Sequence, residues 1–110
     1  MTKSPEWRDV NALLSTHVPP GWVTTYSSLS RHLYGRMLIH PVTSLLKACS
    51  ANAAVDYSHR VVMDDGALSP QRAGGPDRQR QLLIDEGVTF STEGRVDFRS
   101  TPCVDLRSSQ

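Results

Sequence analysis

The sequence predicts a small, mainly helical domain of the winged helix-turn-helix type with a short β-hairpin. Apolar residues recur at helical spacing in four segments, proline and glycine separate these segments, and an alternating stretch follows the last one. A chain of 110 residues is long enough for one core and too short for two. We therefore expect one domain over residues 1–98 and a flexible tail over residues 99–110.

The first helix is expected over residues 5–16. Ser4 can serve as its N-cap, and the proline that follows suits the first helical position because an N–H would be unsatisfied there anyway. Trp7, Val10 and Leu14 recur three or four residues apart, so they form one apolar stripe that should face the core. Two prolines and a glycine in the stretch VPPGW then end the helix.

Two further helices, over residues 26–33 and 41–51, form a candidate helix-turn-helix unit. Thr25 is a suitable cap for the first of them, and Gly35 is a natural C-cap residue. Small polar residues and a lysine on the open face of the second helix are typical of a helix that contacts DNA, although a purely structural helical hairpin would show the same pattern. Four apolar residues of this second helix should face inward: Val42, Leu45, Leu46 and Cys49.

Extended stretches are expected on either side of a fourth helix. Residues 60–63 should form a short strand that ends in a turn at residues 64–66, where the sequence reads Asp-Asp-Gly. Pro76 starts the fourth helix and Gly87 ends it. The alternating residues 88–98 then predict a β-hairpin or wing.

The charges are unevenly distributed although the formal net charge is only +1. No acidic residue lies between Asp9 and Asp56, whereas Arg31, Arg36 and Lys47 lie inside this span. Such a span indicates contact with an anion, and lysine and arginine supply the phosphate attraction on which nucleic-acid binding depends. A region that is weakly basic without any such role is the alternative.

Membrane, metal and redox functions are not expected. There is no run of about 18 apolar residues and no hydrophobic signal region, which predicts a cytoplasmic protein. Cys49 and Cys103 form no C-x-x-C pair and are expected to be ordinary reduced thiols. The four histidines share no ligand spacing, so we expect neither a metal nor a cofactor.

The order of several motifs resembles one known family. VPPGWVTTYSSLSRHL, a helix ending in KACSAN, SHRVVMDDGALS and GPDRQRQLLIDEGVTF together resemble the alkyltransferase-like proteins and the DNA-binding domain of the alkylguanine DNA alkyltransferases, over residues 7–98. The resemblance implies a monomer that binds double-stranded DNA with an alkylated guanine flipped out of the helix. It also implies that the lesion is handed to nucleotide excision repair proteins.

The resemblance predicts a protein that is not an enzyme. The alkyltransferases carry Pro-Cys-His-Arg-Val, and their cysteine accepts the alkyl group, whereas this chain has Tyr57-Ser58-His59-Arg60-Val61. A thiol with a pKa of about 8.5 can be ionised by a neighbouring histidine, but a serine hydroxyl is much harder to ionise and is a poorer nucleophile toward carbon. Ser58 also differs from the tryptophan that most alkyltransferase-like proteins have there.

The resemblance assigns four residues to DNA contact. Tyr26 matches a tyrosine that presses on the phosphate of the extruded nucleotide. Thr43 stands where the family has an arginine that fills the gap in the base stack, and threonine is too short for that role. Ser44 and Lys47 lie on the open face of the same helix, which we expect to enter the minor groove.

The remaining assignments form a base pocket and a structural network. The pocket is expected to be edged by Tyr26, Ser58 and Val61. Asn52 matches a hinge asparagine, His59 and Glu86 match a hydrogen-bonded pair, and Arg60 should bind backbone carbonyls or a carboxylate. A hydrolase built from Ser58, His59 and Glu86 is disfavoured, because adjacent residues of an extended segment project to opposite sides.

The sequence also leaves open a function other than the recognition of damaged DNA. The chain has neither the finger arginine nor the cysteine or tryptophan of its relatives. It could therefore be a regulatory or protein-interaction domain of the same fold with weak DNA binding that does not depend on a lesion.

Overall fold

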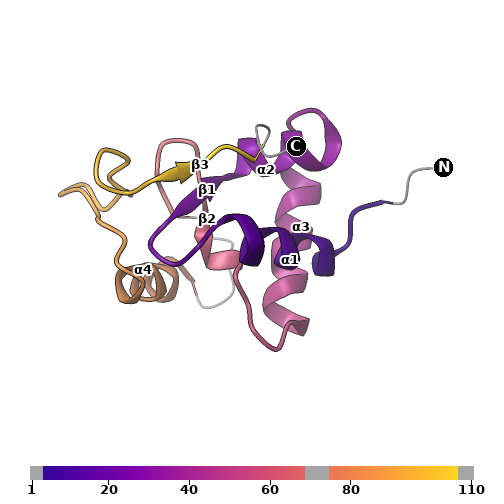
Figure 1. The fold of residues 1–110 in the computed structure, drawn as a ribbon, viewed down its shortest axis with the longest axis horizontal. Coiled ribbons are helices and arrows are strands. Elements are labelled where there is room, and N and C mark those ends of the chain that lie inside the picture. The colour runs from indigo at the N-terminus through magenta and orange to yellow at the C-terminus, as the bar shows by residue number, and fades with distance from the viewer. Residues whose placement is uncertain (1–3, 69–74, 107–110) are drawn as a thin grey trace.

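The computed structural model describes residues 4–68 and 75–106, and this part of the chain is mainly helical, as predicted (Figure 1). The helices α1 and α2 pack against α3 at one end of the molecule, α4 lies at the other end, and a small sheet lies between them. The helices are α1 (Trp7–His17), α2 (Tyr26–Tyr34), α3 (Ile39–Asn52) and α4 (Gly75–Asp85), and the strands are β1 (Val23–Thr25), β2 (Val61–Val62) and β3 (Cys103–Val104).

The first helix begins two residues later than the sequence suggested. Glu6, not Ser4, precedes the first turn of α1, and its backbone N–H donates to the Asp9 carboxylate at 2.9 Å. An acidic residue in the first turn also interacts favourably with the helix dipole. The predicted cap at Ser4 was therefore wrong, whereas Val10 and Leu14 are fully buried as expected.

A short, well-bonded turn joins α2 to α3. Thr25 caps α2 by accepting a hydrogen bond from the backbone N–H of Ser28 at 3.1 Å, and Gly35 ends it in the left-handed conformation, as predicted. The Ser30 hydroxyl then donates to the Arg36 carbonyl at 2.7 Å and accepts from the Leu38 N–H at 2.6 Å. These bonds hold α3 at a fixed position relative to α2.

The helix α3 is longer than predicted. It begins at Ile39, so the proline expected at its start lies within its first turn, where the missing N–H costs no hydrogen bond. Val42, Leu46 and Cys49 are buried as expected, whereas Leu45 is only partly buried against the core.

The C-terminal segment is not the loose tail that the sequence suggested. β1 is the central strand of the sheet and runs parallel to both β2 and β3. The Thr24 hydroxyl donates to the Val104 carbonyl at 2.7 Å, and the Leu106 N–H donates to the Ser28 hydroxyl at 2.6 Å. The Leu106 side chain is fully buried in the core. The domain therefore extends at least to Leu106, and residues 107–110 lie outside the described part of the chain.

The predicted hairpin is present only in a reduced form. Phe90 and Val96 form an isolated antiparallel bridge, and the Val96 N–H donates to the Gly66 carbonyl at 2.9 Å. The segment around Val96 therefore pairs with the turn after β2 as well as with the segment around Phe90. That turn is present as predicted, with the Gly66 N–H donating to the Met63 carbonyl at 2.9 Å.

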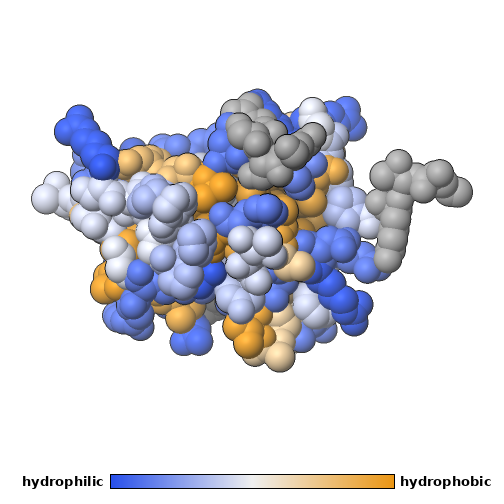
Figure 2. Space-filling view, viewed as in Figure 1, coloured by the Kyte–Doolittle hydropathy of each residue, from blue (hydrophilic) through white to orange (hydrophobic). Residues whose placement is uncertain are grey.

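Two groups of buried residues form the core. The larger lies between α1, α2 and α3, and the smaller joins Val23, Val62 and Leu83 beneath α4. On the face shown in Figure 2, hydrophilic residues make up much of the surface and hydrophobic groups show between them. None of the helices in the described residues is sufficiently long and apolar to cross a membrane. The large hydrophobic side chains that remain exposed are Trp22, Met37, Ile39, Val55, Ile84 and Phe98.

Candidate functional site

The segment that carries the resemblance to the reactive site is a buried turn. Ser58–Arg60 forms one turn of 3₁₀ helix that leads directly into β2, and each of its three side chains belongs to a residue at most 5% exposed. The segment is therefore not extended as expected, so its adjacent side chains need not point to opposite sides. The contacts of each side chain decide its role instead.

The Ser58 hydroxyl faces α3. Its oxygen lies 3.2 Å from the Ser50 hydroxyl, and Ser50 donates to the Asp56 carboxylate at 3.0 Å. The backbone N–H of Ser58 donates to the other oxygen of Asp56 at 2.8 Å. Ser58 thus belongs to a chain of hydroxyl and carboxylate groups that fastens the turn to α3. With 1% of its surface exposed, it presents little of itself to an incoming substrate.

His59 and Arg60 share one carboxylate. His59 Nε2 lies 2.9 Å from Glu86 Oε1, which is the pair that the resemblance implied. Arg60 donates to Glu86 Oε1 at 3.1 Å and to Oε2 at 2.6 Å, and its remaining terminal nitrogen donates to the Val18 carbonyl at 2.8 Å. Arg60 thus binds a carboxylate and a carbonyl as expected, and the cluster joins the turn to the end of α1 and to the residue after α4.

The ionisation of Glu86 follows from these contacts. Burial alone would raise its pKa, but the hydrogen bonds from Arg60 and His59, together with their charges, outweigh that effect and lower the pKa below its ordinary value. Glu86 is therefore held as a carboxylate that pairs with Arg60. The cluster links the turn at Ser58–Arg60 to the residue after α4 through this carboxylate.

A fourth member of this network was missed in the sequence. Gln79 on α4 is fully buried, and its side-chain amide donates to the backbone carbonyls of His59 at 2.9 Å and Val61 at 3.0 Å. Glutamine between two arginines looks like a surface residue. Its position four residues before the buried Leu83 is the signal that could have placed it on the inner face of α4.

The residues expected to contact DNA lie on α2 and α3. Ser44 and Lys47 are exposed, and Tyr26 is 5% exposed at the start of α2. The Thr43 hydroxyl donates to the Ile39 carbonyl of its own helix at 2.8 Å, so it is already bonded. Asn52 binds neighbouring backbone as expected, donating to the Ala48 carbonyl at 2.9 Å.

One residue of the expected base pocket, Tyr26, lines a pocket in the described part of the chain. An open pocket of about 300 Å³ lies beside Tyr26, but its other walls are Met37, Met63, Asp64 and Asp65. Ser58 and Val61 do not line this pocket, and both are 1% exposed. Val61 instead packs in the same core group as Tyr26. The structure thus brings Tyr26 together with two methionines and two carboxylates that sequence reasoning had not connected with it.

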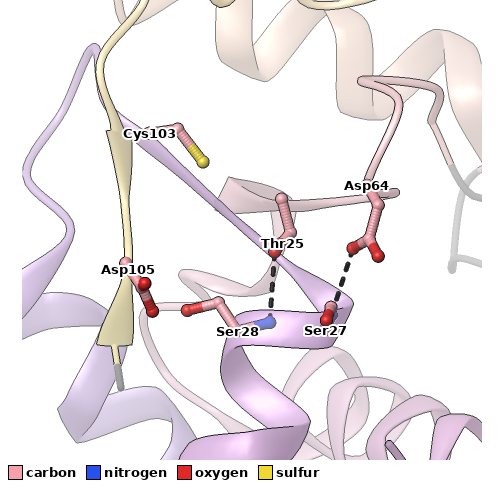
Figure 3. Close-up of a pocket in the computed structure, with 6 residues that line it drawn as sticks. All are labelled: Thr25, Ser27, Ser28, Asp64, Cys103 and Asp105. Carbon is pink, nitrogen blue, oxygen red and sulfur yellow. Dashed lines mark hydrogen bonds between the residues drawn. The ribbon is translucent and has the colours of Figure 1, made fainter. Parts of the chain in front are cut away.

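Asp64 also borders a second pocket, of about 260 Å³, near the start of α2 (Figure 3). Cys103 and Asp105 on the β3 side face Ser28 and Asp64 across it. Burial raises the pKa of the Cys103 thiol, and the charges of Asp105 and Asp64 raise it further, so its reactive thiolate is disfavoured. The other thiol, Cys49, is fully buried in the core and donates to the Trp7 carbonyl at 3.3 Å.

Metal ligation has no support in the described part of the chain. Residues 4–68 and 75–106 contain no group of three or more histidine, cysteine, aspartate or glutamate side chains arranged to hold an ion.

Comparison with known proteins places this architecture in a family. The family model of the 6-O-methylguanine DNA methyltransferase DNA-binding domain matches residues 7–88. The DNA base-flipping proteins of Escherichia coli (strain K12) and Shigella flexneri are each 34% identical to the chain over 84 residues. These matches cover 74% of this chain and 62% of each relative, so the chain spans less than two thirds of their length.

A solved structure has the same fold. The crystal structure of Schizosaccharomyces pombe Atl1, in complex with damaged DNA containing O6-carboxymethylguanine, superimposes with a TM-score of 0.67 at 23% identity. The match covers 93% of this chain and 97% of that chain, so it confirms the winged helix-turn-helix-like architecture. The chain therefore belongs to the family of the 6-O-methylguanine DNA methyltransferase DNA-binding domain.

Proposed function

We propose that this chain binds double-stranded DNA, including DNA with an extruded alkylated guanine, and does so without catalysis. The observation that carries the proposal is the acid-free span from residue 10 to residue 55, which contains both α2 and α3. Arg31, Arg36 and Lys47 within it are all exposed. Cations without neighbouring acids in the same span suit a polyanion such as the DNA backbone.

The arrangement of α2 and α3 supports the same proposal. The bonded turn between them fixes α3 relative to α2, and Ser44 and Lys47 are exposed on α3. A helix held in this way can enter a groove while lysine and arginine contact phosphates on either side. The names of the bacterial relatives, DNA base-flipping proteins, and the damaged DNA bound to Atl1 favour a site that receives an extruded base.

Reactivity supports recognition rather than alkyl transfer. The side chain at the position of the reactive cysteine is the Ser58 hydroxyl, which is buried and lies 3.2 Å from the Ser50 hydroxyl of α3. Neither cysteine offers a substitute, because Cys49 is buried and the pKa of Cys103 is raised. A protein that binds the lesion and leaves the alkyl group in place needs other proteins to repair the DNA. We propose that nucleotide excision repair proteins are these partners, and that the chain acts as a monomer.

Titration of labelled duplexes with and without one 6-O-methylguanine, at two salt concentrations, tests this function. We expect the modified duplex to bind more tightly and both to bind more weakly at the higher salt concentration. Mass measurement of the protein after incubation should show no added alkyl group. Failure of both duplexes to bind would overturn the proposal, and an adduct on the protein would overturn its non-catalytic part.

Replacing Lys47 with glutamine is expected to weaken binding to both duplexes by a similar factor. One charge pair in water contributes about 1 kcal/mol, so the loss should be about fivefold at low salt. The slope of log affinity against log salt should fall by about 1, because one phosphate contact is lost. Arg78→Gln is the control, since this exposed arginine lies on α4 at the far end of the molecule from α3. Equal losses in the two variants would contradict a specific role for Lys47.

Two observations favour the alternative of a regulatory domain with weak binding that does not depend on a lesion. Asp64 and Asp65 line the pocket beside Tyr26, where a phosphate would be repelled, and Thr43 is bonded to its own helix. Equal and weak binding of the modified and unmodified duplexes in the titration above would support this second function.

A further inference from the structure

The turn between α2 and α3 carries an apolar tip, formed by Met37 and Ile39. The two residues are 40% and 39% exposed, so both leave much of their apolar surface in water. Single exposed apolar residues are common in soluble proteins and need no explanation. Two of them within three residues, at the start of the helix that we propose to enter a DNA groove, form a candidate contact surface.

One buried hydroxyl holds the backbone on both sides of Met37. Ser30 on α2 is fully buried, and its hydroxyl donates to the Arg36 carbonyl at 2.7 Å and accepts from the Leu38 N–H at 2.6 Å. Met37 lies between these two residues, so its backbone is held in place while its side chain stays exposed. A fixed backbone reduces the conformational entropy that is lost on binding, and Met37 is therefore presented in a form that suits a contact.

Ile39 extends the side of α3 that carries other proposed DNA contacts. Ile39, Thr43 and Lys47 follow one another at intervals of four residues, so they lie along one side of the helix. The Thr43 hydroxyl donates to the Ile39 carbonyl at 2.8 Å, and its side chain is too short to reach into a base stack. The apolar tip, about one helical turn away, carries the longer side chains on this side.

The charges near the apolar tip favour the base stack of a duplex as its partner. Arg36, next to Met37, is exposed, and the sequence has no acidic residue from residue 10 to residue 55. Asp64 and Asp65 border the pocket of which Met37 forms one wall, and their carboxylates would repel a phosphate there. The part of a duplex that fits the apolar tip is therefore the uncharged stack of bases, while neighbouring cations contact the phosphates.

We propose that Met37 is an apolar wedge that enters the minor groove and inserts between two neighbouring base pairs of the bound duplex, with Ile39 beside it in the groove. Methionine and isoleucine are among the side chains with which minor-groove proteins unstack base pairs and bend the duplex. The inference rests on the proposed binding of DNA and adds the residue that opens the base stack. Thr43 has neither the length nor the apolar surface for this role.

A duplex with 2-aminopurine next to 6-O-methylguanine tests the wedge, because 2-aminopurine fluoresces weakly when it is stacked and strongly when it is unstacked. We expect a saturating amount of the full chain to raise the emission severalfold. Met37→Ala should bind about tenfold more weakly, since most of the apolar contact is lost, and should raise the emission much less at saturation. Met37→Leu should restore both the affinity and the emission, whereas Met37→Gln, with a polar side chain of similar length, should restore neither.

Two control variants separate insertion from other causes of weaker binding. Lys47→Gln should weaken binding but leave the emission at saturation unchanged, because a phosphate contact does not unstack bases. Ile84→Ala should change neither quantity, since Ile84 is 47% exposed but lies on α4 at the other end of the molecule. Thermal unfolding checks that every variant keeps the midpoint of the wild type, as expected for exposed side chains.

The results distinguish a failure of the wedge from a failure of the proposed function. If the duplex binds but Met37→Ala raises the emission as much as the wild type does, the wedge is wrong and the proposed DNA binding stands. If no duplex binds, both proposals are wrong. Size-exclusion chromatography without DNA tests a protein contact instead: a wild type that elutes as a larger species than Met37→Ala would show that the apolar tip joins two copies of the chain, which also contradicts the wedge.

Discussion

Replacing Glu86 with glutamine is expected to lower the free energy of unfolding by about 3 kcal/mol or more. Removing one partner of a buried ion pair costs about 3–5 kcal/mol because the other charge is left without compensation. The Arg60 side chain is only 5% exposed and donates two of its hydrogen bonds to this carboxylate. Glu86 itself is 18% exposed, so water can offset part of the loss, and the effect should lie near the lower end of the range.

Urea denaturation of the wild type and of Glu86→Gln measures the effect, with Glu93→Gln as the control because Glu93 is exposed. The effect should also depend on pH. Since the pKa of Glu86 is lowered in the folded protein, its contribution is fully present above the ordinary value of 4.5 and is lost as the pH falls through the lower, folded value. The two curves of stability against pH should therefore converge in acid. Parallel curves would show that the carboxylate is not the group responsible.

The cluster around Glu86 holds the turn that leads into β2. Arg60 and Gln79 bond the backbone of Val18, His59 and Val61, and these bonds hold the turn in addition to the contact of Ser58 with Ser50. β2 follows this turn directly, and Met63 and Asp64 follow β2 into the pocket. Substitution of the nucleophile can thus leave the pocket walls in place.

The helices were predictable because their signals are local. The stripe of Val10 and Leu14, the cap at Thr25 and the glycine at position 35 act over three or four residues, and the structure retains all of them. The strand predicted over residues 60–63 is present as β2, whereas β3 was not predicted. Two or three residues, as in β3, are too few to show alternation, and a parallel partner far away in the sequence decides whether they pair.

The site was predicted only in part, because several of its contacts join segments that are far apart in the sequence. The resemblance supplied the contact between His59 and Glu86, which does not depend on the residue at position 58. It did not show the hydrogen bonds of Ser58 with Ser50 and Asp56, because these contacts join separate segments of the chain. The carboxylates beside Tyr26 come from the turn after β2, and their proximity follows from the pairing of β2 with β1. Such contacts are set by the tertiary structure.

Shortening the chain after Phe98 is expected to destabilise it by about 4 kcal/mol or more. Truncation of a buried leucine to alanine alone costs about 2–5 kcal/mol, and the shortened chain would lose the whole Leu106 side chain from the core. It would also remove β3 from the edge of β1 and the carbonyl that the buried Thr24 hydroxyl binds, at a further cost of about 1–3 kcal/mol.

Since small domains are stable by only about 5–15 kcal/mol, circular dichroism should show a large fall in the midpoint of thermal unfolding for the shortened chain. Leu106→Ala in the full chain should produce an intermediate fall, because the strand and the Thr24 bond remain. Arg99→Ala, at an exposed position before β3, should leave the midpoint almost unchanged. The tail predicted from the sequence would instead give the same midpoint in all four proteins, so this comparison decides whether residues 99–106 form part of the folded domain.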